Sequence, residues 1–236
     1  MAAKTKRRRS TVNVARLTMW KMIDDTSEGT TYEKEAYTWE NSLANAKYVP
    51  KMQTNEQYGD GIKVEAFVAK DGGDLEININ GFDTGDGAFL FGETDKNGTE
   101  VSNAADVVPN ICVAYYTKRT DKKYNLYKFP KATFYPEGED AKQQEGTTIS
   151  YGTANLKGTY MPLISTQDDK YVRYGVDPEA DKDLIEKWFT EASYYGEDAQ
   201  KMSAPPDGVP VPTNADDDIP VTEEIENADR AFAEKL

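Results

Sequence analysis

The segment Lys63–Asn80 reads KVEAFVAKDGGDLEININ, and its alternating pattern decides the fold class. In its second part, Leu75, Ile77 and Ile79 alternate strictly with polar residues. This period of two is typical of a β-strand that buries one face and exposes the other to water. We therefore predict a half-buried strand at Asp74–Asn80. The polar residues of its wet face are Asp74, Glu76, Asn78 and Asn80.

The first part of the same segment has the same period. Val64, Ala66 and Val68 fall on one side of a predicted strand at Lys63–Lys70. The residues that follow, Asp71-Gly72-Gly73, are of the types that favour tight turns. The sequence therefore predicts a β-hairpin whose turn lies at these three residues.

Further strands are predicted on both sides of this segment, because apolar, aromatic and β-branched residues recur between turn signals. Pro130 and Pro136 cannot donate backbone hydrogen bonds, so their strand is expected at an edge or at a bulge. The polar segment Lys21–Asn45 is either a strand pair or a long loop. The predicted strands are Thr11–Trp20 with one irregularity, Asn110–Thr117, Tyr124–Tyr135, Thr147–Met161 and Tyr171–Val176.

Two stretches depart from the strand period. Gly85–Gly92 carries four consecutive apolar residues between glycines, which favours a short helical turn. Pro178–Tyr195 has apolar residues at helical spacing, and Asp177 and Pro178 suit an N-cap and a first helical residue. A second tight turn is predicted at Asn97-Gly98. The fold class is therefore mainly β, with a flanking α-helix.

The composition divides the chain of 236 residues into three regions. Residues 1–10 form a basic arm, residues 11–196 form the β-rich domain, and residues 197–236 form a Pro/Asp-rich linker with an acidic C-terminal extension. The net charge of −14 disfavours contact with nucleic acid except at a local basic patch. Lys4–Arg9 is such a patch, and it is either a solvated arm or an arm that binds nucleic acid or a protein partner.

The residue types exclude several kinds of chemistry. The chain has no histidine and a single cysteine, Cys112, which we expect to be a small buried apolar residue. Ser-His-Asp and Cys-His catalysis, zinc sites and an intrachain disulfide are therefore not expected. Neither a phosphate-binding P-loop nor a dinucleotide fingerprint is present. The sequence predicts no catalytic activity, no metal and no cofactor.

Three weaker sequence patterns suggest a functional site, but each has a simpler structural explanation. A carboxylate pair could act as in glycosidases, but 42 acidic residues make close pairs unavoidable. Asp95–Glu100 lacks the pattern of a calcium loop and fits a turn better. Exposed tyrosines could bind sugars, although packing in strands, at a helix end or in a subunit interface explains them better. The tyrosines concerned are Tyr115, Tyr116, Tyr124, Tyr127, Tyr194 and Tyr195.

An ordered series of short segments resembles the major tail (tail tube) proteins of long-tailed bacteriophages, in particular the phi13-like family. The resemblance covers about residues 11–176, and its weight comes from the order of the segments. It begins with Tyr58–Glu65, Gly73–Ile79, Phe82-Asp83 and Phe89–Gly92, followed by the turn at Asn97-Gly98. Looser matches are Ile111–Tyr116, Tyr127–Phe134 and Thr153–Thr159.

The resemblance implies a β-sandwich or barrel-like tail tube fold with a flanking helix. It implies a structural subunit that assembles into stacked, hexameric rings, which form a conduit for the viral genome. The implied partners are further copies of the chain, the tape measure and terminator proteins, and DNA bound without sequence specificity. The implied location is the virion tail, after assembly in the host cytoplasm. A wet face such as Asp74, Glu76, Asn78 and Asn80 then either lines the lumen or forms an outer solvated surface.

Two other functions stay open at the level of sequence. One is a different virion β protein, such as a capsid decoration or tail-tip subunit. The other is a carbohydrate-binding or carbohydrate-cleaving β-sandwich. The chain has no secretory signal pattern and no apolar stretch of about 18 residues, so we expect a protein that is made in a cytoplasm and has no membrane partner.

Overall fold

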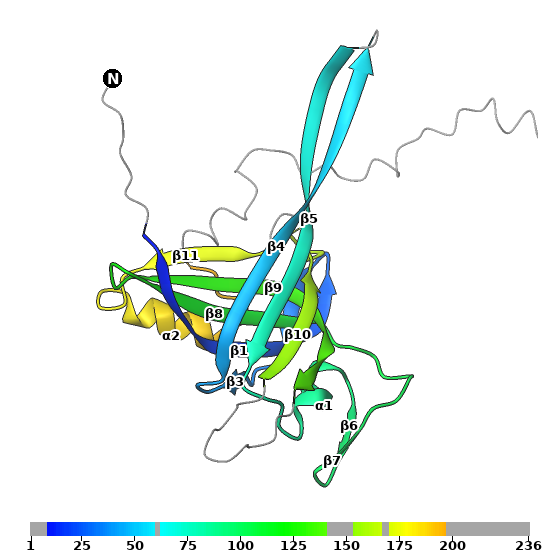
Figure 1. Cartoon of the computed structure of the whole chain (residues 1–236), viewed down its shortest axis with the longest axis vertical. Helices are drawn as coiled ribbons and strands as arrows, with labels where there is room; N and C mark the ends of the chain where they lie inside the picture. Colours follow the sequence, from blue (N-terminus) through cyan, green and yellow to red (C-terminus); the bar gives the residue numbers. More distant parts are fainter. Residues whose placement is uncertain (1–8, 60–61, 141–152, 167–169, 197–236) are drawn as a thin grey trace, which may run out of the picture. The chain divides into compact units, whose positions relative to one another are not determined.

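The computed structural model describes residues 9–59, 62–140, 153–166 and 170–196 (Figure 1). It is mainly β with two helices, which confirms the predicted fold class. The basic residues Lys4–Arg8 and the whole region 197–236 lie outside the described residues. The strands are β1 Thr11–Thr26, β2 Gly29–Tyr32, β3 Tyr37–Trp39, β4 Leu43–Gly59, β5 Ile62–Ile79, β6 Thr94–Lys96, β7 Thr99–Val101, β8 Ile111–Arg119, β9 Tyr124–Asp140, β10 Thr153–Tyr160 and β11 Val172–Val176; the helices are α1 Asp86–Leu90 and α2 Lys182–Thr190.

One large antiparallel sheet contains nine of the described strands. Its order is β2-β1-β8-β9-β10-β5-β4, while β3 pairs with β1 and β11 pairs with β9. The sheet folds over, so β4, β5 and β10 cross β1, β8 and β9 (Figure 1). The short strands β6 and β7 form a separate hairpin around Asn97-Gly98, which confirms the predicted turn.

The main core fills the space between the two crossing halves of the sheet. Leu75, Ile77 and Ile79 are fully buried there, so the strict alternation predicted for Asp74–Asn80 is confirmed. Stacked aromatic rings occupy the opposite wall, with Tyr115 against Tyr127 at a centroid distance of 5.0 Å. A second cluster lies on the other face of the sheet, where α2 packs over β1, β8, β9 and β11.

The hairpin predicted with a turn at Asp71-Gly72-Gly73 is wrong. β5 runs without interruption from Ile62 to Ile79, and its hairpin partner is β4. Gly72 has φ +63°, and the register with β4 shifts nearby, between Pro50 and Met52. The two glycines are needed for a different reason, because the end of β10 lies against their backbone and leaves no room for side chains.

Three predicted irregularities are confirmed as bulges. Arg16 has φ +57°, at a register shift between β1 and β8. Pro130 and Pro136 lie opposite further register shifts, where the ladder does not require their missing N–H groups. β9 is nevertheless an interior strand of the sheet, so the bulged position was the correct alternative.

The remaining elements differ from the predictions mainly in their bounds. The segment Lys21–Asn45 contains the end of β1, the short strands β2 and β3, and the start of β4. α2 is shorter than the predicted Pro178–Tyr195, and its N-cap position is Asp181 instead of Asp177. The carboxylate of Asp177 instead accepts a hydrogen bond from the backbone N–H of Glu179, which forms a turn before the helix. The first part of the strand predicted at Thr147–Met161 lies outside the described residues.

Candidate assembly surface

The predicted site residues lie together on one exposed face, which we call the polar face. Asp74, Glu76 and Asn78 project from β5 on the side opposite to the core, and Asn80 lies just beyond the end of the strand. β4 and β10 flank β5, so their outward side chains complete the same face. In register across the sheet, Lys47 and Lys157 lie on either side of Glu76, and Asn45 and Asn155 lie on either side of Asn78.

The polar face is balanced in charge. Glu76 pairs with Lys47 at 3.2 Å, and Asp74 pairs with Lys51 at 2.6 Å. The third lysine, Lys157, pairs with Glu137 of β9. Asp74 and Glu76 therefore do not form an acidic wall, because two lysines of β4 pair with these carboxylates. β5 alone could not reveal these partners.

An amide pair continues this face beyond the ion pairs. The side-chain N–H of Asn78 donates a hydrogen bond to the side-chain oxygen of Asn155 at 2.7 Å. Asn80 donates from its side chain to the backbone oxygen of Asn41, which ties the end of β5 to the turn before β4. The four predicted residues thus share a face, but Asn80 serves mainly to close the β4–β5 end.

A second feature is the outer part of the β4–β5 hairpin, which we call the outer hairpin and define as Lys51–Gly59 with Ile62–Lys70. β10 pairs with β5 only from Gly73 to Ile79, so the outer hairpin has no strand beside it among the described residues. Figure 1 shows it extending away from the rest of the sheet. A two-stranded ribbon of this kind is marginally stable by itself in water.

The outer hairpin exposes an aliphatic stripe along β5. Ile62 and Val64 are each 70% exposed, and Val68 is 52% exposed. The registry of Thr54 with Val68 places Met52 on the same face, and the ion pair of Glu56 with Lys63 lies on that face too. The register shift between Gln57 and Tyr58 interrupts the alternation at Val64, so the stripe does not keep to one face as far as Ile62. Gln53 and Gln57 lie on the face opposite to Val68. The sequence predicted this alternation but not its exposure, because the pattern of a half-buried strand does not say what covers the apolar side.

β4 also presents a free backbone edge. It pairs with β5 on one side, and no described strand hydrogen-bonds to its other side. β4 also contacts β1. Unpaired edges are the usual sites at which another chain adds a strand. The sequence patterns predicted no strand between Asn45 and Lys63, although Ala46 and Tyr48 alternate with polar residues there.

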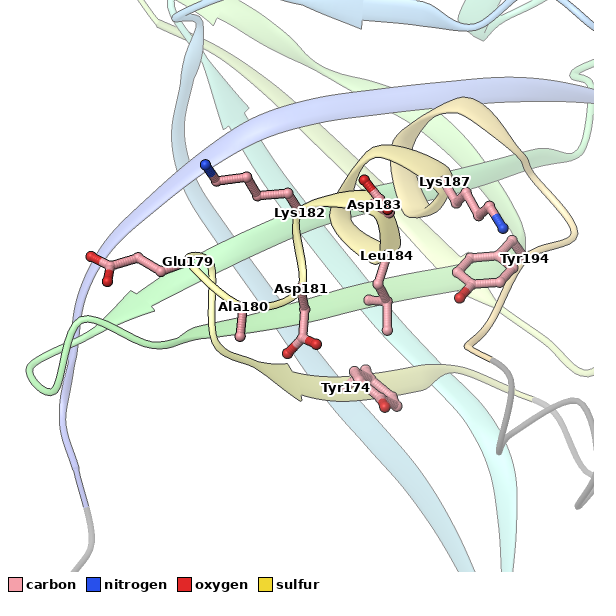
Figure 2. Close-up of a pocket in the computed structure, with 9 residues that line it drawn as sticks. All are labelled: Tyr174, Glu179, Ala180, Asp181, Lys182, Asp183, Leu184, Lys187 and Tyr194. Atoms are coloured by element: carbon pink, nitrogen blue, oxygen red, sulfur yellow. The ribbon is translucent and has the colours of Figure 1, made fainter.

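The cleft beside α2 does not have the geometry of an active site. It has a volume of about 630 Å³ and is lined by residues of β11, the β11–α2 loop, α2 and the segment after it. Figure 2 shows that its charged side chains point in different directions: Asp181 is directed toward Tyr174, whereas Glu179 and Lys182 point away from it. No pair of acids converges on a common point in this view.

Other candidate chemistry is absent from the described part of the chain. No group of three or more His, Cys, Asp or Glu residues could hold a metal ion there. Asp95–Glu100 forms the β6–β7 hairpin. Tyr115, Tyr127 and Tyr194 are buried, whereas the half-buried Tyr116 stacks on Tyr124 at a centroid distance of 4.7 Å. No helix among the described residues is long and apolar enough to cross a membrane.

Comparisons with known proteins do not assign the chain to a family. No family model matches the sequence, and no curated protein matches it. The functional proposal therefore rests on the resemblance of the short segments and on the geometry of the polar face and the outer hairpin.

Proposed function

We propose that the chain is a structural subunit that binds copies of itself and forms the tail tube of a long-tailed bacteriophage. In this proposal the subunits form stacked rings of six, assembled in the host cytoplasm and located in the virion tail. The tube is a conduit for DNA and contacts the tape measure and terminator proteins. The subunit performs no catalysis.

The outer hairpin is the observation that carries this proposal. Its exposed stripe of Ile62, Val64 and Val68 is unfavourable in water, because exposed aliphatic surface gains roughly 25 cal/mol per Å² when it is covered. The free edge of β4 can at the same time accept backbone hydrogen bonds from another strand. Both features suit contact with a protein surface better than contact with a small ligand.

A second copy of the chain is the partner that these features suit best. Every copy carries the same projecting ribbon, so a ribbon that docks on a different surface of a neighbour makes a heterologous contact. Such contacts repeat, and they close into rings or continue into filaments. The ribbon is long, with 17 residues in β4 and 18 in β5, so it can contact a neighbour without disturbing the core of its own subunit.

The polar face suits a surface along which DNA passes. Its lysines Lys47, Lys51 and Lys157 are paired with carboxylates, so they are not available to hold phosphates by counterion release. A charge-balanced wall neither attracts nor strongly repels the DNA backbone. The assignment of Asp74, Glu76, Asn78 and Asn80 to the lumen belongs to this proposal.

Electron microscopy and sedimentation velocity of the purified full chain test the proposal. The wild-type protein is expected to form rings or tubes as its concentration rises. The double variant V64E/V68E places two charges in the aliphatic stripe and is expected to remain monomeric. The matched control Q53E/Q57E adds the same charges to the opposite face of the ribbon and is expected to assemble.

Two results would count against this function. A wild-type chain that stays monomeric at every accessible concentration would oppose self-assembly itself. Assembly of V64E/V68E with wild-type affinity would show that the stripe is not the contact, and would remove the observation on which the proposal rests.

A further inference from the structure

Lys128 of β9 is fully buried beneath α2. Among the described residues, Thr18, Asp86 and Lys128 are the buried polar or charged ones, and the neighbours of Lys128 form the second apolar cluster. Burying an ammonium group is costly unless its hydrogen bonds are replaced. The surroundings of Lys128 therefore need a specific explanation.

Two carbonyl groups and three aromatic rings replace the water around Lys128. Its Nζ donates to the backbone oxygen of Glu191 at 2.7 Å and of Tyr194 at 2.8 Å. The same nitrogen lies 5.0 Å from the ring centroid of Trp188, 5.3 Å from that of Trp20 and 5.6 Å from that of Tyr195. These are cation–π distances.

These contacts explain why α2 ends early. Glu191 takes an extended conformation at the end of the helix, and the chain then continues to Gly196 over the same cluster. In a longer helix, the backbone carbonyls of Glu191 and Tyr194 would accept hydrogen bonds from N–H groups of later residues. Here they accept hydrogen bonds from Lys128. We call Lys182–Gly196 the α2 cap. Lys128 is thus the polar link between this cap and the sheet.

We propose that the α2 cap is a proton-coupled latch, which closes most tightly when Lys128 is neutral and loosens when Lys128 takes up a proton. A neutral amine has two N–H groups, and the two carbonyls still accept both. The closed cap therefore keeps its hydrogen bonds on deprotonation, and it loses the cation–π attraction of the three rings together with the cost of a buried charge. When the cap opens, water hydrates the ammonium group.

The other titratable groups around Lys128 do not change this direction. Burial raises the pKa of Cys112 on β8 to about 12 in the closed state, and opening returns it to about 9, so the proton that Cys112 releases on opening opposes the effect of Lys128 without reversing it. Burial likewise raises the pKa of Tyr32 on β2 far above its ordinary value. The side chain of Glu191 is exposed, and Tyr195 presents its ring. Lys187 of α2 lies over the ring of Tyr194.

The sign of the pH effect follows from the shift of Lys128. Burial lowers the pKa of Lys128 from 10.5 to about 8 in the closed state, whereas the open state regains the ordinary value. The closed state then binds fewer protons between these values, so its stability rises with pH. The equilibrium constant for opening is expected to fall about 5-fold between about pH 7.5 and about pH 9.5, because the roughly 20-fold effect of Lys128 is partly offset by a roughly 4-fold opposite effect of Cys112.

Cys112 provides the measurement, because it is the only cysteine and lies under the cap. Its Sγ lies 3.9 Å from the backbone oxygen of Ala192, and its side chain is fully buried. The equilibrium constant for opening is obtained as the ratio of two rates of thiol alkylation, measured at the same pH. The first is the rate for the native full chain, and the second is the rate for the urea-unfolded chain. Denaturant dependence of this ratio separates opening of the cap from global unfolding.

The wild-type ratio is expected to fall with pH, whereas the ratio for Lys128→Met is expected to rise about 4-fold, because only the opposing titration of Cys112 remains. Lys128→Arg cannot lose its charge and should also rise with pH. The matched control Lys131→Met, on the same strand, should retain the wild-type slope because Lys131 pairs with Asp25 outside this cluster. A flat wild-type profile, or an unchanged slope in Lys128→Met, would overturn the proposal.

Discussion

The backbone carbonyl of Tyr160, at the end of β10, occupies the space in which a side chain on Gly72 of β5 would have to stand. Gly72 also has φ +63°, which favours glycine. We predict that Gly72→Ala lowers the free energy of unfolding by about 3 kcal/mol or more, since it combines backbone strain with a clash against main-chain atoms. Urea unfolding followed by circular dichroism measures the change.

Gly98 is the matched control for that substitution. It has φ +76° in the β6–β7 turn, but nothing lies near the position of its missing side chain. Gly98→Ala should therefore lower the free energy of unfolding only by the cost of placing alanine at a positive φ, about 1 kcal/mol. Equal losses at both positions would show that the close approach of Tyr160 is not important.

Asp86 at the start of α1 connects that helix to β3. The residue is buried; it accepts hydrogen bonds from the Tyr37 hydroxyl at 2.7 Å and from the backbone N–H of Asp83 at 2.8 Å. Tyr37→Phe removes one partner of a buried carboxylate, so we predict a loss of about 1.5–3 kcal/mol of stability. The exposed Asp83 is the control, and its replacement by Ala should cost much less. Thermal unfolding distinguishes the two.

Buried tyrosines should make the protein unstable in strong alkali. Burial raises the pKa of Tyr160 to about 12 and raises the pKa of Tyr115 still further. The folded state then keeps protons that the unfolded state releases near pH 10, so this contribution to stability is complete below that pH and is lost above it. Ultraviolet absorbance of tyrosinate should show a late-titrating class in the native chain that is missing in urea.

Tyr160→Phe should remove one tyrosine from the group that titrates at higher pH in the native chain. Its hydroxyl is buried without a hydrogen-bond partner among the described residues, so the change should alter stability at neutral pH by less than about 1 kcal/mol. If the native and urea-unfolded chains titrated identically, the tyrosines would not be buried as described.

The position of the polar face in an assembled tube can be tested by chemical labelling. Asn78→Cys places a thiol on this face, while the native Cys112 stays buried. If the face lines a lumen, a small maleimide should label assembled Asn78→Cys and a large polymer-linked maleimide should not. Glu186→Cys on the exposed side of α2 is the control for labelling from outside. Equal labelling of both sites by the large reagent would place the polar face on the outer wall.

The local patterns of the sequence predicted most elements correctly. The alternation of Leu75, Ile77 and Ile79 identified the buried face of β5, and the helical spacing around Trp188 identified α2. Asn97-Gly98 predicted a turn because residues of this kind readily take positive φ values. These predictions succeed because they depend on the conformation of a few neighbouring residues, and on which side of a strand or helix is apolar.

Other features required partners distant in the sequence. Gly72-Gly73 predicted a turn, but the approach of Tyr160 makes these glycines necessary within a continuous strand. The acids Asp74 and Glu76 of β5 are visible in the sequence, but their ion-pair partners Lys51 and Lys47 come from β4. α2 ends where it does because Lys128, more than 60 positions earlier, takes the carbonyl of Glu191.

The sequence by itself therefore determined that the protein is β-rich, which faces of β5 are apolar and polar, and that no histidine chemistry is possible. Only the tertiary structure decided that β4 pairs with β5 along its whole length, that the aliphatic stripe of Ile62, Val64 and Val68 is uncovered, and that Lys128 is buried. The physical reason is that periodicity records the environment of a strand face, whereas strand pairing and the burial of a charge depend on long-range contacts that no local pattern contains.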